Sequence, residues 1–183
     1  AGATSVLSGT NTKAVASGVA NFSANALTLT GTVDTYTLTY SLGSYTSATQ
    51  TVTLLPGAAT KLAVTTAPAG FVNRVAFTTQ PVVTVQDASG NTVTDSTAQI
   101  TVGMDYTTLA GTLTVNAVNG IADWSQAASP LTPQTTAGTR ILYFDSPGLT
   151  QARYTFVLSP GAATQIIVSK TVNASSAGAP LYY

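Results

Sequence analysis

The fold is decided by residues 52–60, which read Val-Thr-Leu-Leu-Pro-Gly-Ala-Ala-Thr, because the chain contains this stretch twice. The second copy, residues 156–164, reads Phe-Val-Leu-Ser-Pro-Gly-Ala-Ala-Thr and lies 104 residues further along. A short apolar segment follows each copy. The spacing is well above the roughly 20 to 50 residues of solenoid repeats, so each copy belongs to a unit of domain size.

The similarity extends upstream of this stretch. Residues 7–10 align with 109–112, and residues 17–22 align with 119–124, in both cases with an offset of 102 residues. The difference between the two offsets predicts a two-residue insertion within the repeat.

These alignments predict the organisation of the chain. We expect residues 1–59 to be the C-terminal half of one repeat and residues 60–164 to be a complete repeat. Residues 165–183 then form the opening strand of a further repeat, or a strand donated to a neighbour. Because residues 1–59 lack the opening strands of a repeat, we expect the first unit to have open edges.

The pattern within the complete repeat is typical of β-strands. Short runs rich in Val, Ile and Thr are separated by turn signals such as residues 87–91, Asp-Ala-Ser-Gly-Asn, and the hairpin pair Asn119-Gly120. No stretch shows a sustained helical period. The sequence therefore predicts an all-β chain of immunoglobulin-like β-sandwich domains in tandem, since about 100 residues is one such sandwich.

The last hairpin of each copy predicts which face is buried. Leu38 and Tyr40 match Leu142 and Phe144, whereas the positions between them in the first copy are Thr. The apolar set is expected to pack inward and the Thr set to face water. Burial of this kind predicts that Leu38→Ala and Leu142→Ala each cost about 2 to 5 kcal/mol.

Composition excludes several classes of function. Only 7% of the residues are charged, with 6 basic and 6 acidic side chains and no net charge, so nucleic acid and membranes are not expected partners. His, Cys and Glu are absent, which removes most general-base chemistry and the usual zinc ligands. We expect no catalytic residue, no metal and no cofactor. A near-neutral surface favours association and a protein that works immobilised.

Four phrases in the sequence carry a family resemblance: GTVDTYTLTY (31–40), PGAATKLAVTT (56–66), QPVVTVQDASGNTVT (80–94) and GTLTVNAVNGIA (111–122). They resemble the immunoglobulin-like tandem repeats of bacterial surface proteins, adhesins and surface-layer proteins. The resemblance covers nearly the whole chain. It implies a scaffold at the cell surface or outside the cell, and it implies no particular site.

A few residues allow a functional and a structural interpretation. Asp87, Asp95 and Asp105 could converge on calcium, but the favoured interpretation is that Asp87 caps its own turn. Trp124 occupies the position of Phe22, which favours a core aromatic over a carbohydrate platform. Lys61 could form an isopeptide cross-link, but its equivalent is Gln165, which favours an ordinary strand-edge lysine.

Two motifs match the pattern for N-glycosylation, at Asn21 and Asn173. Asn21 alternates with the inward Phe22 and should be exposed. Both are candidate glycan sites if the source organism carries out this modification.

Two segments are candidates for assembly. Where the first copy has outward Thr37, Thr39 and Thr53, the second has the apolar patch Ile141, Tyr143 and Val157, which we expect to pack against a neighbour. The second candidate is a donated strand, and its residues are Gln165, Ile166, Ile167, Val168 and Ser169.

These observations favour a structural repeat of an extracellular fibre, stalk or surface layer that assembles head to tail with neighbouring repeats or subunits. The alternative is an adhesin module that binds a glycan or a host protein. Exposed aromatic residues clustered on loops would favour the adhesin, and apolar patches on sheet faces would favour assembly.

Overall fold

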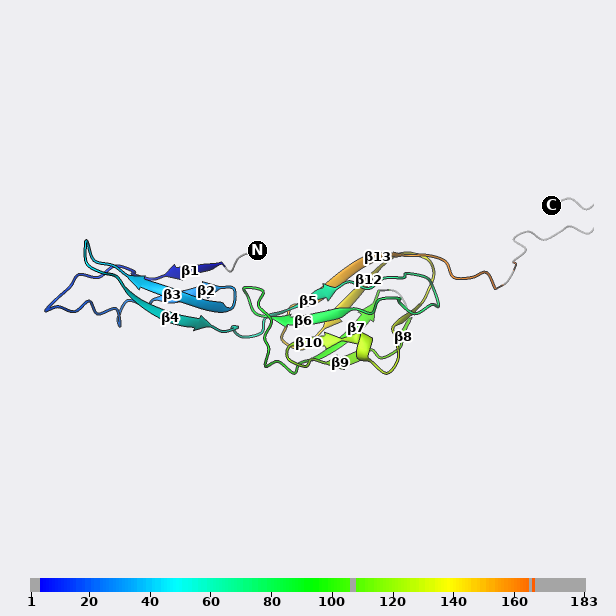
Figure 1. Cartoon of the computed structure of the whole chain (residues 1–183). Coiled ribbons are helices and arrows are strands. Elements are labelled where there is room, and N and C mark those ends of the chain that lie inside the picture. Colours follow the sequence, from blue (N-terminus) through cyan, green and yellow to red (C-terminus); the bar gives the residue numbers. More distant parts are fainter. Residues whose placement is uncertain (1–3, 106–107, 165, 167–183) are drawn as a thin grey trace, which may run out of the picture.

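The structure is a computed structural model that describes residues 4–105, 108–164 and 166. The described residues form strands and a single 3-10 turn, η1, at Trp124–Gln126 (Figure 1). This confirms the predicted all-β, β-sandwich class. No helix in these residues has the length and apolar character needed to cross a membrane.

Two units lie end to end (Figure 1). We call residues 4–59 the first unit and residues 60–164 the second unit. The strands of the first unit are β1 (Ser5–Ser8), β2 (Thr28–Gly31), β3 (Asp34–Tyr40) and β4 (Ala48–Leu54). Those of the second unit are β5 (Lys61–Thr66), β6 (Val82–Gln86), β7 (Gln99–Met104), β8 (Thr108–Ala110), β9 (Thr114–Asn116), β10 (Ile121–Asp123), β11 (Thr132–Gln134), β12 (Gly138–Asp145) and β13 (Ala152–Leu158).

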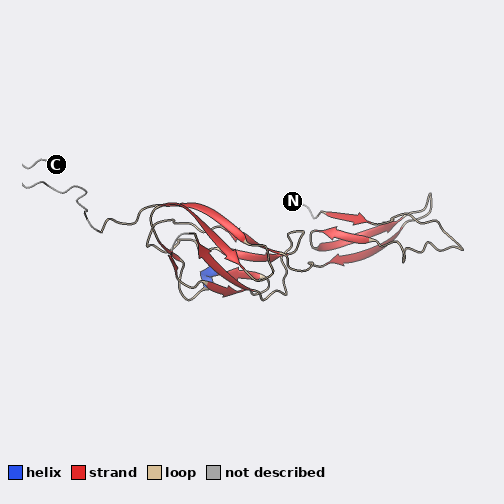
Figure 2. Cartoon of the chain, turned by 180° about the vertical axis from the view of Figure 1, so that it is seen from behind, coloured by secondary structure: helices blue, strands red, loops and turns tan. Residues whose placement is uncertain are grey.

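The second unit has the layers of a sandwich around one core. Its sheets have the strand orders β10-β6-β5, β13-β12-β7-β9 and β11-β8, and Figure 2 shows them enclosing the interior. Alternate residues of β12 and β13 are buried, as a period of two requires. The largest fully buried side chains include Trp124, Phe144, Ile100, Leu131 and Leu142.

The first unit repeats part of this arrangement in the same register. β1 pairs with β2 through Leu7 and Leu29, and β8 pairs with β11 through the equivalent Leu109 and Pro133. The hairpin β3-β4 likewise matches β12-β13, strand for strand. The repeat seen in the sequence is thus a repeat of strand pairing.

The equivalents of β9 and β10 are not strands in the first unit. In the second unit β9 pairs with β7 and β10 pairs with β6, and both partners come from residues 60–104. The first unit has no equivalent of those partners among the described residues. Its segments 12–14 and 19–21 therefore have no ladder to join.

The missing layer changes the burial of the first unit. None of its described residues is buried, and Leu38 is only half-buried, whereas Leu142 is fully buried. The expectation that these two leucines are buried alike is therefore wrong for this chain. The reason is that β12 and β13 are covered by a facing sheet and β3 and β4 are not.

The first and last segments of the second unit run parallel to each other. Lys61 bridges to Thr150 near one end, and Val72 bridges to Ser159 near the other. The Leu62 N–H donates to the Thr150 carbonyl at 2.9 Å, and the Asn73 N–H donates to the Ser159 carbonyl at 3.0 Å.

Candidate functional site at the joint between the units

The turn at residues 87–91 follows β6 and closes on itself. The Asp87 N–H donates to the Asn91 carbonyl at 2.9 Å, and the Gly90 N–H donates to the Asp87 carbonyl at 3.1 Å. Gly90 has a φ of +89°, which glycine adopts without strain. The Asp87 Oδ1 accepts from the Asn91 N–H at 2.9 Å, so the prediction that Asp87 caps its own turn is confirmed.

Asp87 also reaches across to the first unit. Its Oδ2 accepts a hydrogen bond from the Gly57 N–H at 2.9 Å, in the segment that links the two units. A Cβ atom on Gly57 would lie 3.6 Å from that same oxygen, which is ordinary contact. Asp87 therefore binds a backbone group on the linker while it holds its own turn.

Asn91 makes the second connection, through both the oxygen and the nitrogen of its side-chain amide. Its Nδ2 donates to the Gly31 carbonyl at 2.8 Å and to the Asp87 Oδ2 at 2.9 Å. Its Oδ1 accepts from the Val33 N–H at 2.9 Å. An amide supplies both a donor and an acceptor, and a carboxylate at this position would supply only acceptors. We call this set of contacts, between the 87–91 turn and Gly31, Val33 and Gly57, the joint.

The side chains of the joint are withdrawn from water. Asp87 is 5% exposed and Asn91 is 9% exposed, which is unusual for polar residues unless they are hydrogen-bonded. Burial raises the pKa of Asp87, but hydrogen bonds from the Asn91 side chain and from the N–H groups of Gly57, Asn91 and Ser89 outweigh it. The net effect holds the pKa of Asp87 below its ordinary value of 3.8.

The sequence predicted only one part of this joint, the turn residue Asp87. Asp87 was recognised as a turn residue, but its contact with the linker and the role of Asn91 were not predicted. A buried Asn has to satisfy two donors and an acceptor, and neither its burial nor its distant partners can be read from a turn motif.

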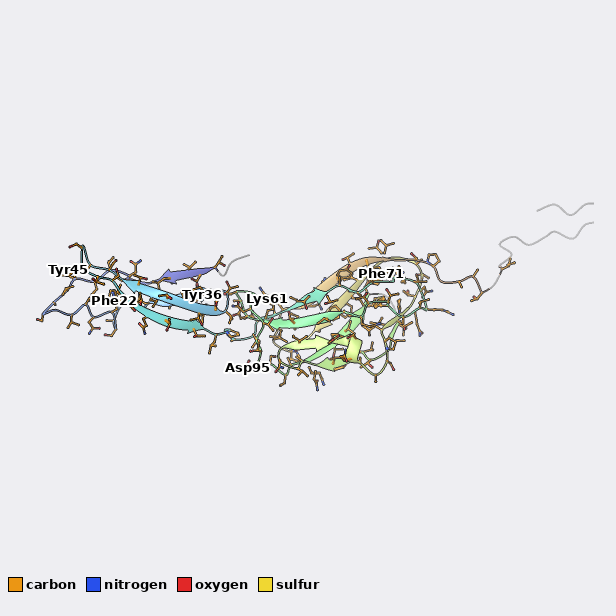
Figure 3. All side chains as sticks on the ribbon, in the orientation of Figure 1. Phe22, Tyr36, Tyr45, Lys61, Phe71 and Asp95 are labelled. Atoms are coloured by element: carbon orange, nitrogen blue, oxygen red, sulfur yellow. The ribbon has the colours of Figure 1, made fainter. Side chains whose placement is uncertain are left out.

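The three carboxylates considered for calcium have separate surroundings. Asp87 is engaged in the joint, and the Asp105 Oδ1 accepts from the Ile141 N–H at 2.7 Å. Asp95 is exposed at the end of the second unit that faces the first (Figure 3). In the part of the chain that the structure describes, no three acidic side chains gather as a metal would need.

Trp124 is a core residue, as predicted. It is 1% exposed, its Nε1 donates to the Thr112 carbonyl at 2.9 Å, and its ring lies 5.4 Å from that of Phe144. The equivalent pair in the first unit, Phe22 and Tyr40, has ring centroids 5.9 Å apart. The aromatic pair is therefore repeated, although only the second copy is fully covered.

Lys61 lies at the joint end of the second unit (Figure 3). Its Nζ donates to the Ala88 carbonyl at 3.4 Å, a long contact to the 87–91 turn. The side chain is half-buried along the strand edge.

The three residues of the proposed assembly patch lie on one face but differ in their exposure. Ile141, Tyr143 and Val157 do lie on one face, because Ile141 pairs with Thr155 and Val157 pairs with Thr139 in the β12-β13 ladder. Only Val157 is largely exposed, at 66%, whereas Ile141 and Tyr143 are half-buried. The Tyr143 ring covers the backbone of Gly103 on β7, so part of this face is already used within the unit.

The remaining candidates are placed only in part. Asn21 is exposed, and its Oδ1 accepts from the Ser23 N–H at 2.9 Å, as Asp123 does from Ser125 at the equivalent position. Asn173 lies outside the described residues. Of the predicted donated strand, Ile166 is exposed, and Gln165 and residues 167–169 lie outside the described residues.

Comparison with solved structures finds domains of much larger enzymes. A β-glycosidase from Bacteroides vulgatus is 9% identical with a TM-score of 0.46, over 73% of this chain and 19% of that chain. A β-glucuronidase from Parabacteroides merdae is 16% identical with a TM-score of 0.41, over 61% of this chain and 15% of that chain. The chain thus spans less than a fifth of their length, and likeness at this level does not bear on function. No protein-family model and no curated protein matches the sequence.

Proposed function

We propose that this chain is a structural piece of an extracellular fibre, stalk or surface layer, built from immunoglobulin-like units that join head to tail. The proposal includes the tandem arrangement, the location outside the cell and the family resemblance to repeats of bacterial surface proteins. It assigns the chain no catalytic step.

The observation that carries the proposal is the joint. Asp87 and Asn91 connect the two units through three hydrogen bonds to backbone groups of Gly31, Val33 and Gly57. Buried, mutually satisfied polar groups fix the geometry in which two surfaces meet. A linker with no function beyond tethering needs no such contacts, whereas a series of units with a defined spacing does.

A second observation supports assembly over ligand binding. Exposed large apolar side chains are frequent in the first unit, and they include Val6, Leu7, Val15, Val19 and Leu42. Packing against a neighbouring unit or chain would cover these side chains. Among the described aromatic side chains only Tyr40 and Tyr45 are exposed, and Figure 3 places Tyr45 at the far end of the first unit, where Phe22 also lies. Tyr45 is the one exposed aromatic of the described loops, because Tyr40 ends β3, and a single loop aromatic gives little support to the adhesin alternative.

The proposal is tested by locating and imaging the native protein. Antibodies against this chain should label intact cells of the source organism, and negative-stain electron microscopy of the released material should show filaments or a lattice with a regular axial repeat. Labelling only after the cells are permeabilised would refute the location. Dispersed particles that bind a glycan on an array would favour the adhesin.

A further inference from the structure

A groove at the far end of the second unit matches the place where the 87–91 turn binds the first unit. It has a volume of about 520 Å³, and its lining includes Asn73, Arg74, Thr136, Ala137 and Gly161. Figure 1 shows the chain after β13 at the end of the second unit opposite to the first unit. The joint and this groove therefore lie at opposite ends of one sandwich.

The backbone groups of the joint have equivalents here. By the 104-residue offset, Gly57 corresponds to Gly161, and Val33 corresponds to Ala137. Gly31 corresponds in the same way to Thr135. The strand pairing supports this alignment, because Leu38 pairs with Gln50 and Leu142 with the equivalent Tyr154.

In the first unit the turn binds these groups, and within the described part of the chain the equivalent groups at the far end have no such partner. Gly57 and Val33 donate to Asp87 and Asn91, but the N–H groups of Gly161 and Ala137 donate no hydrogen bond within the described residues. At the joint itself a cavity of about 140 Å³ remains, lined in part by Gly31, Gly57 and the turn residues Asp87 and Asn91. The two cavities have the Gly57 and Gly161 positions in common. The far groove is also bordered by Asn73, whose Oδ1 accepts from the Thr135 N–H at 2.9 Å and leaves the Thr135 carbonyl available to an incoming donor.

The charge of the groove also favours a turn of the 87–91 type as its occupant. Arg74 lines the groove, is exposed, and has a backbone φ of +62°. An incoming turn of the 87–91 type would bring one carboxylate into a groove whose lining has one cation and no anion. Opposite charges brought together as surfaces dock favour the correct pairing over others.

We propose that this groove is the docking site for the Asp-Ala-Ser-Gly-Asn turn of another unit of the 60–164 type, which binds the Gly161 N–H through its Asp and the Ala137 N–H and the Thr135 carbonyl through its Asn. This inference rests on the proposed function, because it names the partner surface of a head-to-tail array. Each complete unit then carries a turn at one end and a receiving groove at the other.

The test is a chain in which residues 61–164 are repeated directly after Thr164, in place of residues 165–183. We expect amide hydrogen exchange at Gly161 and Ala137 to slow by about tenfold or more, the mark of a hydrogen bond formed in the folded state. A matched chain whose appended turn carries Ala at the equivalents of Asp87 and Asn91 should exchange at the rate of the natural chain. A doubled near-ultraviolet signal from buried Trp verifies that the appended unit folds.

A second probe works without an appended unit. A cyclic peptide of residues 85–93, titrated into the isotopically labelled natural chain, should shift the amide resonances of Gly161 and Ala137, and the peptide with Ala at both turn positions should not. Unchanged exchange in a folded fusion, or no shift with the peptide, overturns the inference.

The Gly57 and Val33 amides serve as internal references in both experiments. If they are protected and Gly161 is not, the docking inference fails and the existing joint stands. If Gly57 is unprotected as well, the joint itself is absent and the proposed function loses its basis.

Discussion

At the scale of single residues, the joint depends on an amide that a carboxylate cannot replace. Asn91 donates to the Gly31 carbonyl and to Asp87, and it accepts from Val33. The substitution Asn91→Asp keeps the shape of the side chain but places two carboxylates in hydrogen-bond contact and removes both donated bonds.

We expect Asn91→Asp to lower the free energy of unfolding of the second unit by about 2 to 3 kcal/mol at neutral pH, measured by urea unfolding followed by Trp124 fluorescence. Asn116→Asp is the matched control, because Asn116 is exposed on β9. Equal stability of the two variants would contradict the role given to Asn91.

Asp87 makes the joint sensitive to acid. Its pKa is below the ordinary value in the folded chain, so its ionised form stabilises the fold fully above about pH 3.8. That contribution is lost as the pH falls through the folded pKa, because the unfolded chain then binds the proton more readily. The urea midpoint should therefore fall, as the pH is lowered below about 4, more steeply in the natural chain than in Asp87→Asn. Asp95→Asn removes one carboxylate from the same end of the unit and is the control; a slope unaffected by Asp87→Asn would refute the assignment.

At the scale of elements, one turn occurs twice with different surroundings. Ser17 and Gly18 have φ values of 51° and 78°, and Asn119 and Gly120 have 51° and 76°, the positive values of a type I′ hairpin turn. A Cβ on Gly120 would lie 2.4 Å from the Val93 carbonyl, whereas a Cβ on Gly18 would meet nothing within 4 Å.

Gly18 and Gly120 allow the cost of backbone strain alone to be compared with the cost of strain plus a steric clash. Gly18→Ala should lower the free energy of unfolding by about 1 kcal/mol, which is the cost of a left-handed backbone conformation alone. Gly120→Ala should lower it by about 3 kcal/mol, because the Val93 carbonyl must also move. Far-ultraviolet circular dichroism in urea measures both. Similar losses in the two variants would show that the second turn is not confined as described.

The two equivalent leucines should respond differently to truncation. Leu142→Ala removes a fully buried side chain and should destabilise the second unit by about 2 to 5 kcal/mol. Leu38→Ala acts on a half-exposed side chain and should cost less than about 2 kcal/mol. Equal losses in urea unfolding would mean that Leu38 is covered in solution, for example by association of two chains.

Sequence patterns predicted the strands better than the surfaces between them. The repeat and the period-two alternation predicted the pairing of both hairpins and the buried positions of β12-β13, because alternation is a local consequence of the pleat. Tyr40, predicted to pack inward in the first unit, is exposed. The exposure of Leu38 depends on whether a sheet lies opposite, and the half-burial of Tyr143 depends on Gly103 of the neighbouring strand β7. No local pattern contains that information. The joint was missed for the same reason, since Asn91 and Gly31 are sixty residues apart.

At the scale of the whole molecule, the two units have unequal cores. The second unit contains the buried hydrophobic cluster, and no described residue of the first unit is buried. Burial of apolar surface is the main stabilising contribution in a domain that has no disulfide. The first unit should accordingly unfold at a lower denaturant concentration than the second.

The single Trp of the chain makes this difference measurable. Trp124 is buried in the second unit, so its fluorescence follows that unit alone, whereas far-ultraviolet circular dichroism follows the strands of both. We expect the circular dichroism transition to begin at lower urea than the fluorescence transition. Coincident transitions would indicate that the joint couples the units into one cooperative body.

The parallel pairing of the first and last segments of the second unit determines how the unit would respond to pulling. The chain enters beside Lys61 and leaves after Ser159 at opposite ends, and these two segments are held together at Thr150 and at Val72. Tension applied along the chain would slide one segment past the other, so the bridging hydrogen bonds would be loaded in shear and would have to break together rather than one after another. Forced unfolding is governed by the height of that barrier rather than by equilibrium stability. A sandwich connected in this way is suited to carry mechanical load along its length.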